Sequence, residues 1–238
     1  MLEKHIKLRN LWNNFLNVVF PARCMSCGKE GCDLCTDCLC ASPSAERESA
    51  EWIFPAFDYR HIPVKKAIWL LKYKNRRNLA KIFALVIYGK IIEELSDLSV
   101  LQNFREPILI PVPLSAKRYR ERGYNQAELI CNELVKLDQE RKEDRHWTSF
   151  ETSNVYLEIG KNILIKIKET EHQANIKDRR ERLKNLSGTF AVKNRELLEK
   201  KNVILIDDVT TTGATLNEAR KILKENGARK VIAFTIAH

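Results

Sequence analysis

The chain has 238 residues, of which 44% are hydrophobic and 30% charged, and its formal net charge is +10. This composition is typical of a folded globular protein and excludes a chain that is disordered throughout. No apolar run approaches the roughly twenty residues of a membrane-spanning helix, and the N-terminus lacks the hydrophobic core of a signal peptide. We therefore expect a cytoplasmic protein with no transmembrane segment. The excess of Lys and Arg favours polyanionic partners.

The first predicted element is an amphipathic helix over residues 8–19. Its apolar side chains follow the spacing of one helix face: Leu8, Leu11, Trp12, Phe15, Leu16 and Val19. Pro21 ends it. We expect this helix to pack on the body of the protein, because its polar face carries Asn13, Asn14 and Asn17 and not the basic stripe of a membrane-surface helix.

A cysteine cluster follows, between Cys24 and Cys40. Two CxxC pairs, Cys24 with Cys27 and Cys35 with Cys38, predict a tetrahedral structural Zn²⁺ site in a small ribbon. Cys32 is the first substitute for one of these ligands, because Cys32 and Cys35 also form a CxxC pair, and Cys40 has no assigned role. A redox CxxC motif is the competing interpretation. Cys131, on a predicted helix, is expected to be a buried apolar residue.

Small polar residues from Ala41 to Ser49 predict a linker. We therefore divide the chain into an N-terminal helix (1–21), a zinc ribbon (22–45) and a main domain (50–238). Strands are predicted over 53–59, 107–112, 163–167, 189–192, 203–207 and 230–236. Helices are predicted over 64–73, 79–95, 127–137 and 216–226, and residues 138–160 have no confident assignment. Strands that alternate with helices predict an α/β fold with a mostly parallel, doubly wound sheet.

The segment from Val203 to Thr215 reads VILIDDVTTTGAT. An apolar strand ends in two carboxylates, and a hydroxyl-rich turn with one glycine then opens a helix. Ligands of open α/β sheets bind at the carboxyl ends of strands, and helix N-termini favour anions. Asp207 and Asp208 are therefore candidates to bind ribose hydroxyls, and the turn to bind a 5′-phosphate. The candidate phosphate loop comprises Thr211, Thr212, Gly213, Ala214 and Thr215. The plainer alternative is a strand end followed by a helix cap.

A second strand, 107–112, also ends in a polar turn. It leads through Pro-Val-Pro-Leu-Ser into a basic run that closes with Arg-Gly-Tyr-Asn-Gln. Such cations could neutralise a diphosphate. The candidate pyrophosphate loop comprises Arg118, Arg120, Arg122, Gly123, Asn125 and Gln126. A solvated basic helix face would explain the cations equally well, although not the rest of the pattern.

These motifs resemble two related groups of proteins. The 203–215 segment is similar to the signature of type I phosphoribosyltransferases, which bind phosphoribosyl pyrophosphate (PRPP). The run PVPLSAKRYRERGYNQAEL, the spaced pattern from Thr170 through Gln173, Ile176, Arg182 and Asn185 to Gly188, the DDVTTTGATL run and the cysteine ribbon resemble the ComF family. In this chain Lys166 and Lys168 stand where family members often carry Arg. A lysine keeps the charge but loses the bidentate fork.

The resemblance implies a type I phosphoribosyltransferase-like fold, a small N-terminal zinc ribbon and Mg²⁺ bound with PRPP. It also implies that residues 166–182 form a mobile hood loop. No residue pattern in the chain indicates a catalytic residue, a nucleobase pocket or an oligomeric state. Three functions follow: a PRPP-binding competence protein that handles incoming single-stranded DNA, with Tyr119 and Tyr124 stacking on bases; an active phosphoribosyltransferase with an unidentified acceptor; and a PRPP-sensing regulatory module. The first also implies DNA-uptake machinery as a partner.

Overall fold

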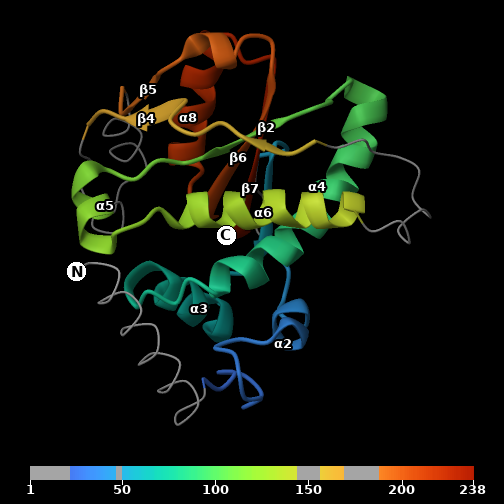
Figure 1. Ribbon diagram of the computed structural model, residues 1–238, viewed down its shortest axis with the longest axis vertical. Coiled ribbons are helices and arrows are strands. Elements are labelled where there is room, and N and C mark those ends of the chain that lie inside the picture. The colour runs from blue at the N-terminus through green and yellow to red at the C-terminus, as the bar shows by residue number, and fades with distance from the viewer. Residues whose placement is uncertain (1–21, 47–49, 144–155, 169–187) are drawn as a thin grey trace. The chain divides into compact units, whose positions relative to one another are not determined.

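The computed structural model describes residues 22–46, 50–143, 156–168 and 188–238 (Figure 1). The predicted helix at 8–19, the spaced pattern between Thr170 and Asn185 and most of the predicted hood loop lie outside these residues. The chain divides into two compact units between Ser42 and Pro43.

In its described residues, 22–42, the smaller unit contains the cysteine cluster and the short helix α2 (Thr36–Cys40). Leu34 and Leu39 are fully buried. A metal bound by several cysteines can add folding free energy to a small unit of this kind.

The larger unit is built on a five-stranded sheet in the order β1-β7-β6-β2-β3, in which every pairing is parallel. Its strands are β1 (Ile53–Phe57), β2 (Ile108–Pro111), β3 (Glu158–Ile159), β6 (Asn202–Val209) and β7 (Lys230–Ala237). Its helices are α3 (Ile62–Tyr73), α4 (Leu79–Gln102), α5 (Ala116–Arg122), α6 (Gln126–Glu143) and α8 (Ala214–Glu225), with a 3₁₀ turn, η2, at Arg195–Leu197. The predicted mostly parallel α/β architecture is confirmed.

Alternate residues of the central strands face opposite sides of the sheet, and both sides are buried. Val203, Leu205 and Ala233 share one apolar cluster with α8. Ile204 and Phe234 have the opposite parity and are also fully buried. Helices α4 and α6 pack against each other and against the central strands. A sheet covered on both faces explains why β6 and β7 read as continuous apolar runs.

The structure differs from the sequence prediction at two of the shorter segments. The segments predicted as strands at 163–167 and 189–192 do form strands, β4 (Leu164–Lys166) and β5 (Phe190–Val192), but they pair antiparallel in a separate two-stranded sheet. Part of the unassigned 138–160 region is also ordered. Helix α6 continues to Glu143, and β3 adds an edge strand to the main sheet.

Helix α3 brings side chains to the edge of the sheet where β6 ends. Its inner face is apolar, with Val64, Ala67, Ile68 and Leu71 buried. Pro63 lies in the first turn, where its missing N–H costs nothing. Lys72 and Tyr73 are the last two residues of the helix and directly follow the buried Leu71.

Candidate functional site

Strands β2 and β6 are hydrogen-bonded neighbours, with Pro111 in register with Ile206. Because they are parallel, the segments that follow them emerge at the same edge of the sheet. Both sequence motifs therefore lie at this edge, where open α/β folds bind their ligands. Val112, directly after β2, remains attached to β6 because its N–H donates to the Ile206 carbonyl at 2.9 Å.

The two carboxylates at the end of β6 have different surroundings. Asp208 is buried, and one of its oxygens lies 2.6 Å from Lys72 Nζ on α3. Its other oxygen accepts a hydrogen bond from Gln126 Nε2. Asp207 is half-buried, and its Oδ1 accepts the N–H of Asp208 at 2.8 Å. Asp208 is thus held on both oxygens by the protein itself.

The pKa of Asp207 is raised to about 7. Burial is the largest cause, and the neighbouring Asp208 carboxylate adds to it. The backbone N–H of Asp208 and the cations Lys72 and Lys166 act in the opposite direction. A carboxyl group that shares its surroundings with a second one is typical of a functional site, because stability alone would favour a single acid.

This raised pKa has a measurable effect on stability. The folded chain holds the Asp207 proton more tightly than the unfolded chain, so the carboxylate destabilises the fold increasingly as the pH rises from about 4 to above 7. Asp207→Asn should therefore increase the free energy of unfolding at pH 8 by about 1–4 kcal/mol, a gain that shrinks towards pH 4. Urea unfolding at several pH values measures it. Asp97→Asn, at an exposed position of α4, is the control, and an Asp207→Asn variant that is no more stable than wild type at pH 8 would contradict the assignment.

The Thr-rich turn links β6 to α8 in a tight conformation. The N–H of Thr210 donates to the Ala237 carbonyl at 3.0 Å, and this hydrogen bond attaches the start of the turn to β7. Gly213 has φ +70, which an L side chain adopts only with strain. Thr212 Oγ1 accepts the N–H of Ala214 at 3.4 Å. All five candidate phosphate-loop residues, 211–215, therefore lie in this turn or the first turn of α8. The N-cap residue of α8 is Gly213, which makes no side-chain cap hydrogen bond, so neither Thr212 nor Thr215 is the cap that the alternative interpretation requires.

The basic run after β2 forms a short helix, α5, as the alternative interpretation anticipated. Ser115 caps its N-terminus by accepting the N–H of Arg118, and Gly123 ends it with φ +76. Of the six candidate pyrophosphate-loop residues, Arg118 is half-buried and Arg120 is exposed. The other four residues are Arg122, Gly123, Asn125 and Gln126. Gly123 ends α5, and the other three make hydrogen bonds within the protein.

The closing amides of this loop point into the protein. Asn125 Nδ2 donates to the Val112 carbonyl at 3.0 Å, and its Oδ1 accepts the N–H of Ala127 at the start of α6. Gln126 Oε1 accepts a hydrogen bond from Arg122 Nη1 at 2.8 Å, while its Nε2 donates to Asp208. Gln126 thus joins the basic loop directly to the acidic pair.

Helix α3 contributes two residues that the sequence motifs do not predict. Lys72 pairs with Asp208, and Tyr73 accepts a hydrogen bond from Arg122 through its hydroxyl at 3.4 Å. The sequence contains only a weak indication that Lys72 contributes to the site. Lys72 is four residues after buried Ile68, so a cation lies at the edge of an apolar helix face. This position does not indicate which acid it meets.

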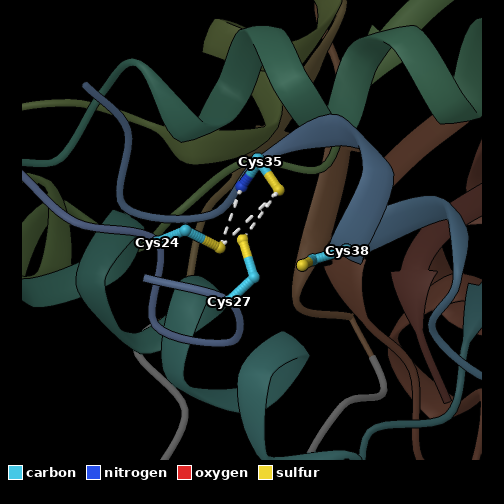
Figure 2. A group of neighbouring side chains, drawn as sticks. All are labelled: Cys24, Cys27, Cys35 and Cys38. Carbon is cyan, nitrogen blue, oxygen red and sulfur yellow. Dashed lines mark hydrogen bonds between the residues drawn. The ribbon is translucent and has the colours of Figure 1, made fainter. Parts of the chain in front are cut away.

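The four predicted zinc ligands gather in the smaller unit (Figure 2). The sulfurs of Cys24, Cys27, Cys35 and Cys38 all lie within 4.8 Å of one another. Cys35 Sγ is 3.7 Å from both Cys24 Sγ and Cys27 Sγ. Among the described residues, Cys32 and Cys40 are not members of this group. The cluster can hold one metal ion, and four thiolates suit Zn²⁺.

The backbone around Cys24 favours the thiolate form of that residue. Gly28, with φ +78, donates its N–H to the Cys24 carbonyl at 2.8 Å and closes the first CxxC turn. Burial disfavours the charged form of Cys24, but backbone hydrogen bonds from Cys27, Cys35 and Ser26 lower its pKa to about 6. Cys131 is fully buried on α6, as predicted, and burial raises the pKa of its thiol.

Comparison with known proteins identifies the class to which this site belongs. The phosphoribosyl transferase domain family matches residues 146–238, a range that includes the acidic pair and the Thr-rich turn. Together with the parallel sheet, this match shows that the chain carries a type I phosphoribosyltransferase-like domain. Within the described residues, no helix is long and apolar enough to cross a membrane.

Similarity to three curated proteins indicates more specifically which phosphoribosyltransferase-domain proteins this chain resembles. The chain is 29% identical to Competence protein F of Haemophilus influenzae over 220 residues, which cover 89% of this chain and 83% of the relative. It is 33% identical to Competence protein ComFC of Streptococcus pneumoniae over 139 residues, 57% of this chain but only 50% of the relative. It is 24% identical to DNA utilization protein YhgH of Salmonella typhimurium over 83% of this chain and 74% of the relative. Together with the domain match, these relatives support a ComF-family phosphoribosyltransferase-domain protein.

Proposed function

We propose that the protein binds Mg²⁺·PRPP at the edge of the sheet formed by β2 and β6, and that it handles single-stranded DNA during DNA uptake. The observation that carries the PRPP proposal is the Gln126–Asp208 hydrogen bond, which brings the basic loop and the acidic pair together across a long separation in sequence. A ligand with a ribose between a phosphate and a diphosphate needs both elements at once.

Each part of the ligand has a chemical counterpart at this edge. Asp207, which is less enclosed than Asp208, would accept hydrogen bonds from the ribose hydroxyls. The turn from Thr211 to Thr215 would bind the 5′-phosphate through hydroxyls and helix N-terminal amides. The cations of α5 would neutralise the diphosphate. Mg²⁺ would bind mainly through the diphosphate, the ribose hydroxyls and water, because it retains most of its hydration shell.

The proposed role in DNA uptake rests on the relatives. Two of them are competence proteins and a third is a DNA utilization protein. The net charge of +10 is suited to a polyanion. The cytoplasm, where such DNA is received, is the compartment that we propose.

A second candidate function is phosphoribosyl transfer, which the domain match favours. In that reaction a base nitrogen displaces pyrophosphate from the anomeric carbon of PRPP, and the protein acts by positioning and electrostatic stabilisation. Pyrophosphate release with a panel of nucleobases tests it. Release with one base would establish turnover, and no release with any base would leave binding as the function.

The binding proposal is tested by isothermal titration with Mg²⁺·PRPP. We expect Asp207→Asn/Asp208→Asn to abolish binding. Because Asp208→Asn also removes the partner of Lys72, the single variant Asp207→Asn is needed, and it should weaken binding at least about tenfold, as the loss of a charge-assisted hydrogen bond predicts. The matched control is Glu93→Gln/Glu94→Gln, another adjacent acidic pair, in α4. Wild-type affinity in the Asp207 variant would overturn the assignment.

A further inference from the structure

In one stretch of the larger unit, every charged residue is a lysine or an arginine. From Tyr59 to Ile92 the sequence contains no Asp or Glu. Its charged residues are Arg60, Lys65, Lys66, Lys72, Lys74, Arg76, Arg77, Lys81 and Lys90. Helix α3 occupies the first part of this stretch. Since its inner face is apolar and buried, its cations other than Lys72 are exposed.

Two large aromatic rings are exposed among these cations. Trp69 is 46% exposed and Tyr73 is 50% exposed. They lie one helical turn apart, with ring centroids separated by 6.1 Å and planes inclined at 47°. We call the surface formed by Lys65, Lys66, Trp69, Tyr73 and Lys74 the α3 outer face. Neighbouring exposed aromatic rings on a monomer commonly mark a binding surface.

Each ring has a cation on it. Lys74 Nζ lies 5.3 Å from the centroid of Trp69, and the Arg122 guanidinium lies 5.0 Å from the centroid of Tyr73. Arg122 comes from α5, so the face continues onto the candidate diphosphate loop. Rings that alternate with cations match a strand whose bases stack while its phosphates are neutralised.

The structure also corrects which tyrosine can stack on a base. Tyr124, which the sequence suggested, is buried, its hydroxyl donates to the Leu71 carbonyl, and Arg77 lies 4.4 Å from its ring centroid. It is therefore a packing residue of the loop. Tyr119, on α5, is 51% exposed, so its ring is accessible for stacking on a base.

We propose that the α3 outer face binds single-stranded DNA, with bases stacked on Trp69 and Tyr73 and phosphates paired with Lys74, Arg122 and the neighbouring lysines. This proposal rests on the proposed function and assigns a surface to its nucleic-acid partner. The charge of the face favours a polyanion over a neutral protein partner. A membrane surface fits less well, because Lys65 and Lys66 interrupt the apolar residues of the face.

The first test measures fluorescence anisotropy of a labelled oligothymidylate, a strand without secondary structure. Each ring-to-alanine change should weaken binding roughly tenfold, the effect of losing one base–aromatic stack. Trp69→Phe should restore most of the affinity lost in Trp69→Ala. The matched control is Tyr156→Ala, since Tyr156 is also an exposed ring, 65% accessible, with Lys142 Nζ 3.4 Å from its centroid. Unchanged affinity in Trp69→Ala/Tyr73→Ala would overturn the proposal.

Parallel measurements separate this surface from the PRPP site. Trp69→Ala, at a position outside the candidate PRPP site, should bind Mg²⁺·PRPP like wild type, and Asp207→Asn should bind oligothymidylate like wild type. If wild type binds no oligothymidylate, the DNA-handling function fails together with the surface. If it binds and the aromatic variant binds equally, only the surface is wrong. Binding to anionic vesicles without binding to the oligonucleotide would identify a membrane face and overturn the proposal.

Discussion

Replacing Lys72 with Met should lower the free energy of unfolding by about 3–5 kcal/mol, the cost of leaving a buried carboxylate without its cation. The Lys72 side chain is 18% exposed and that of Asp208 only 7%, and their charged atoms are 2.6 Å apart. Lys72 is also one of the cations that oppose the raised pKa of Asp207. Without Lys72, the adjacent carboxylates of Asp207 and Asp208 both lose a neutralising positive charge. Urea denaturation measures the effect.

Two further variants make this result specific. Lys66→Met is the same change at an exposed position of the same helix, and it should alter stability by no more than about 0.5 kcal/mol. Lys72→Met/Asp208→Asn removes both charges and should recover most of the lost stability, since the penalty comes from the unpaired charge. Equal losses in the single and double variants would show that Lys72 acts through packing and not through the ion pair.

The second large effect concerns the cysteine cluster. Cys35→Ser, or removal of zinc by a chelator, should unfold the smaller unit. Structural zinc contributes about 10–16 kcal/mol in zinc-finger peptides, which is as large as the whole stability of an ordinary domain. The larger unit should keep its parallel sheet. Zinc content by mass spectrometry and limited proteolysis of the ribbon report the two consequences.

Cysteines outside the group provide the controls for that experiment. Cys40 is exposed and Cys32 is partly exposed, and neither belongs to the four-sulfur group. Cys40→Ser and Cys32→Ser should retain one zinc per chain and resist protease like wild type. Loss of zinc in Cys32→Ser would restore the alternative ligand set that the Cys32–Cys35 spacing left open.

The sequence was most informative where local pattern and long-range structure agree. The runs at 203–207 and 230–236 could only be buried strands, and they became the centre of the sheet. The short segments at 163–167 and 189–192 were equally apolar, but periodicity does not reveal which sheet a strand joins. They pair with each other instead. The cysteine spacing predicted the four cysteines that cluster, because a CxxC turn fixes their geometry locally, while the Cys32–Cys35 pair left one substitution open.

The candidate site was predictable in its motifs but not in its contacts. The acidic pair, the Thr-rich turn and the basic loop each stood out by residue type. The ion pair of Asp208 with Lys72 and the inward orientation of Gln126 did not, since both depend on how distant segments pack. Tyr124 was misjudged for the same reason. A tyrosine among arginines could face solvent or the core, and its hydrogen bond to Leu71 decides for the core.

The position of Lys72 on α3 has a consequence for how two ligands could influence each other. Lys72 contacts Asp208, while Trp69 and Tyr73, within one turn of the same helix, form the outer face. If both proposed ligands bind, this turn is common to them. If PRPP binding shifts this turn and changes the affinity for DNA, DNA binding must change the affinity for PRPP by the same factor, because equilibrium coupling is reciprocal. PRPP would then act as an effector of DNA binding, and DNA as an effector of PRPP binding.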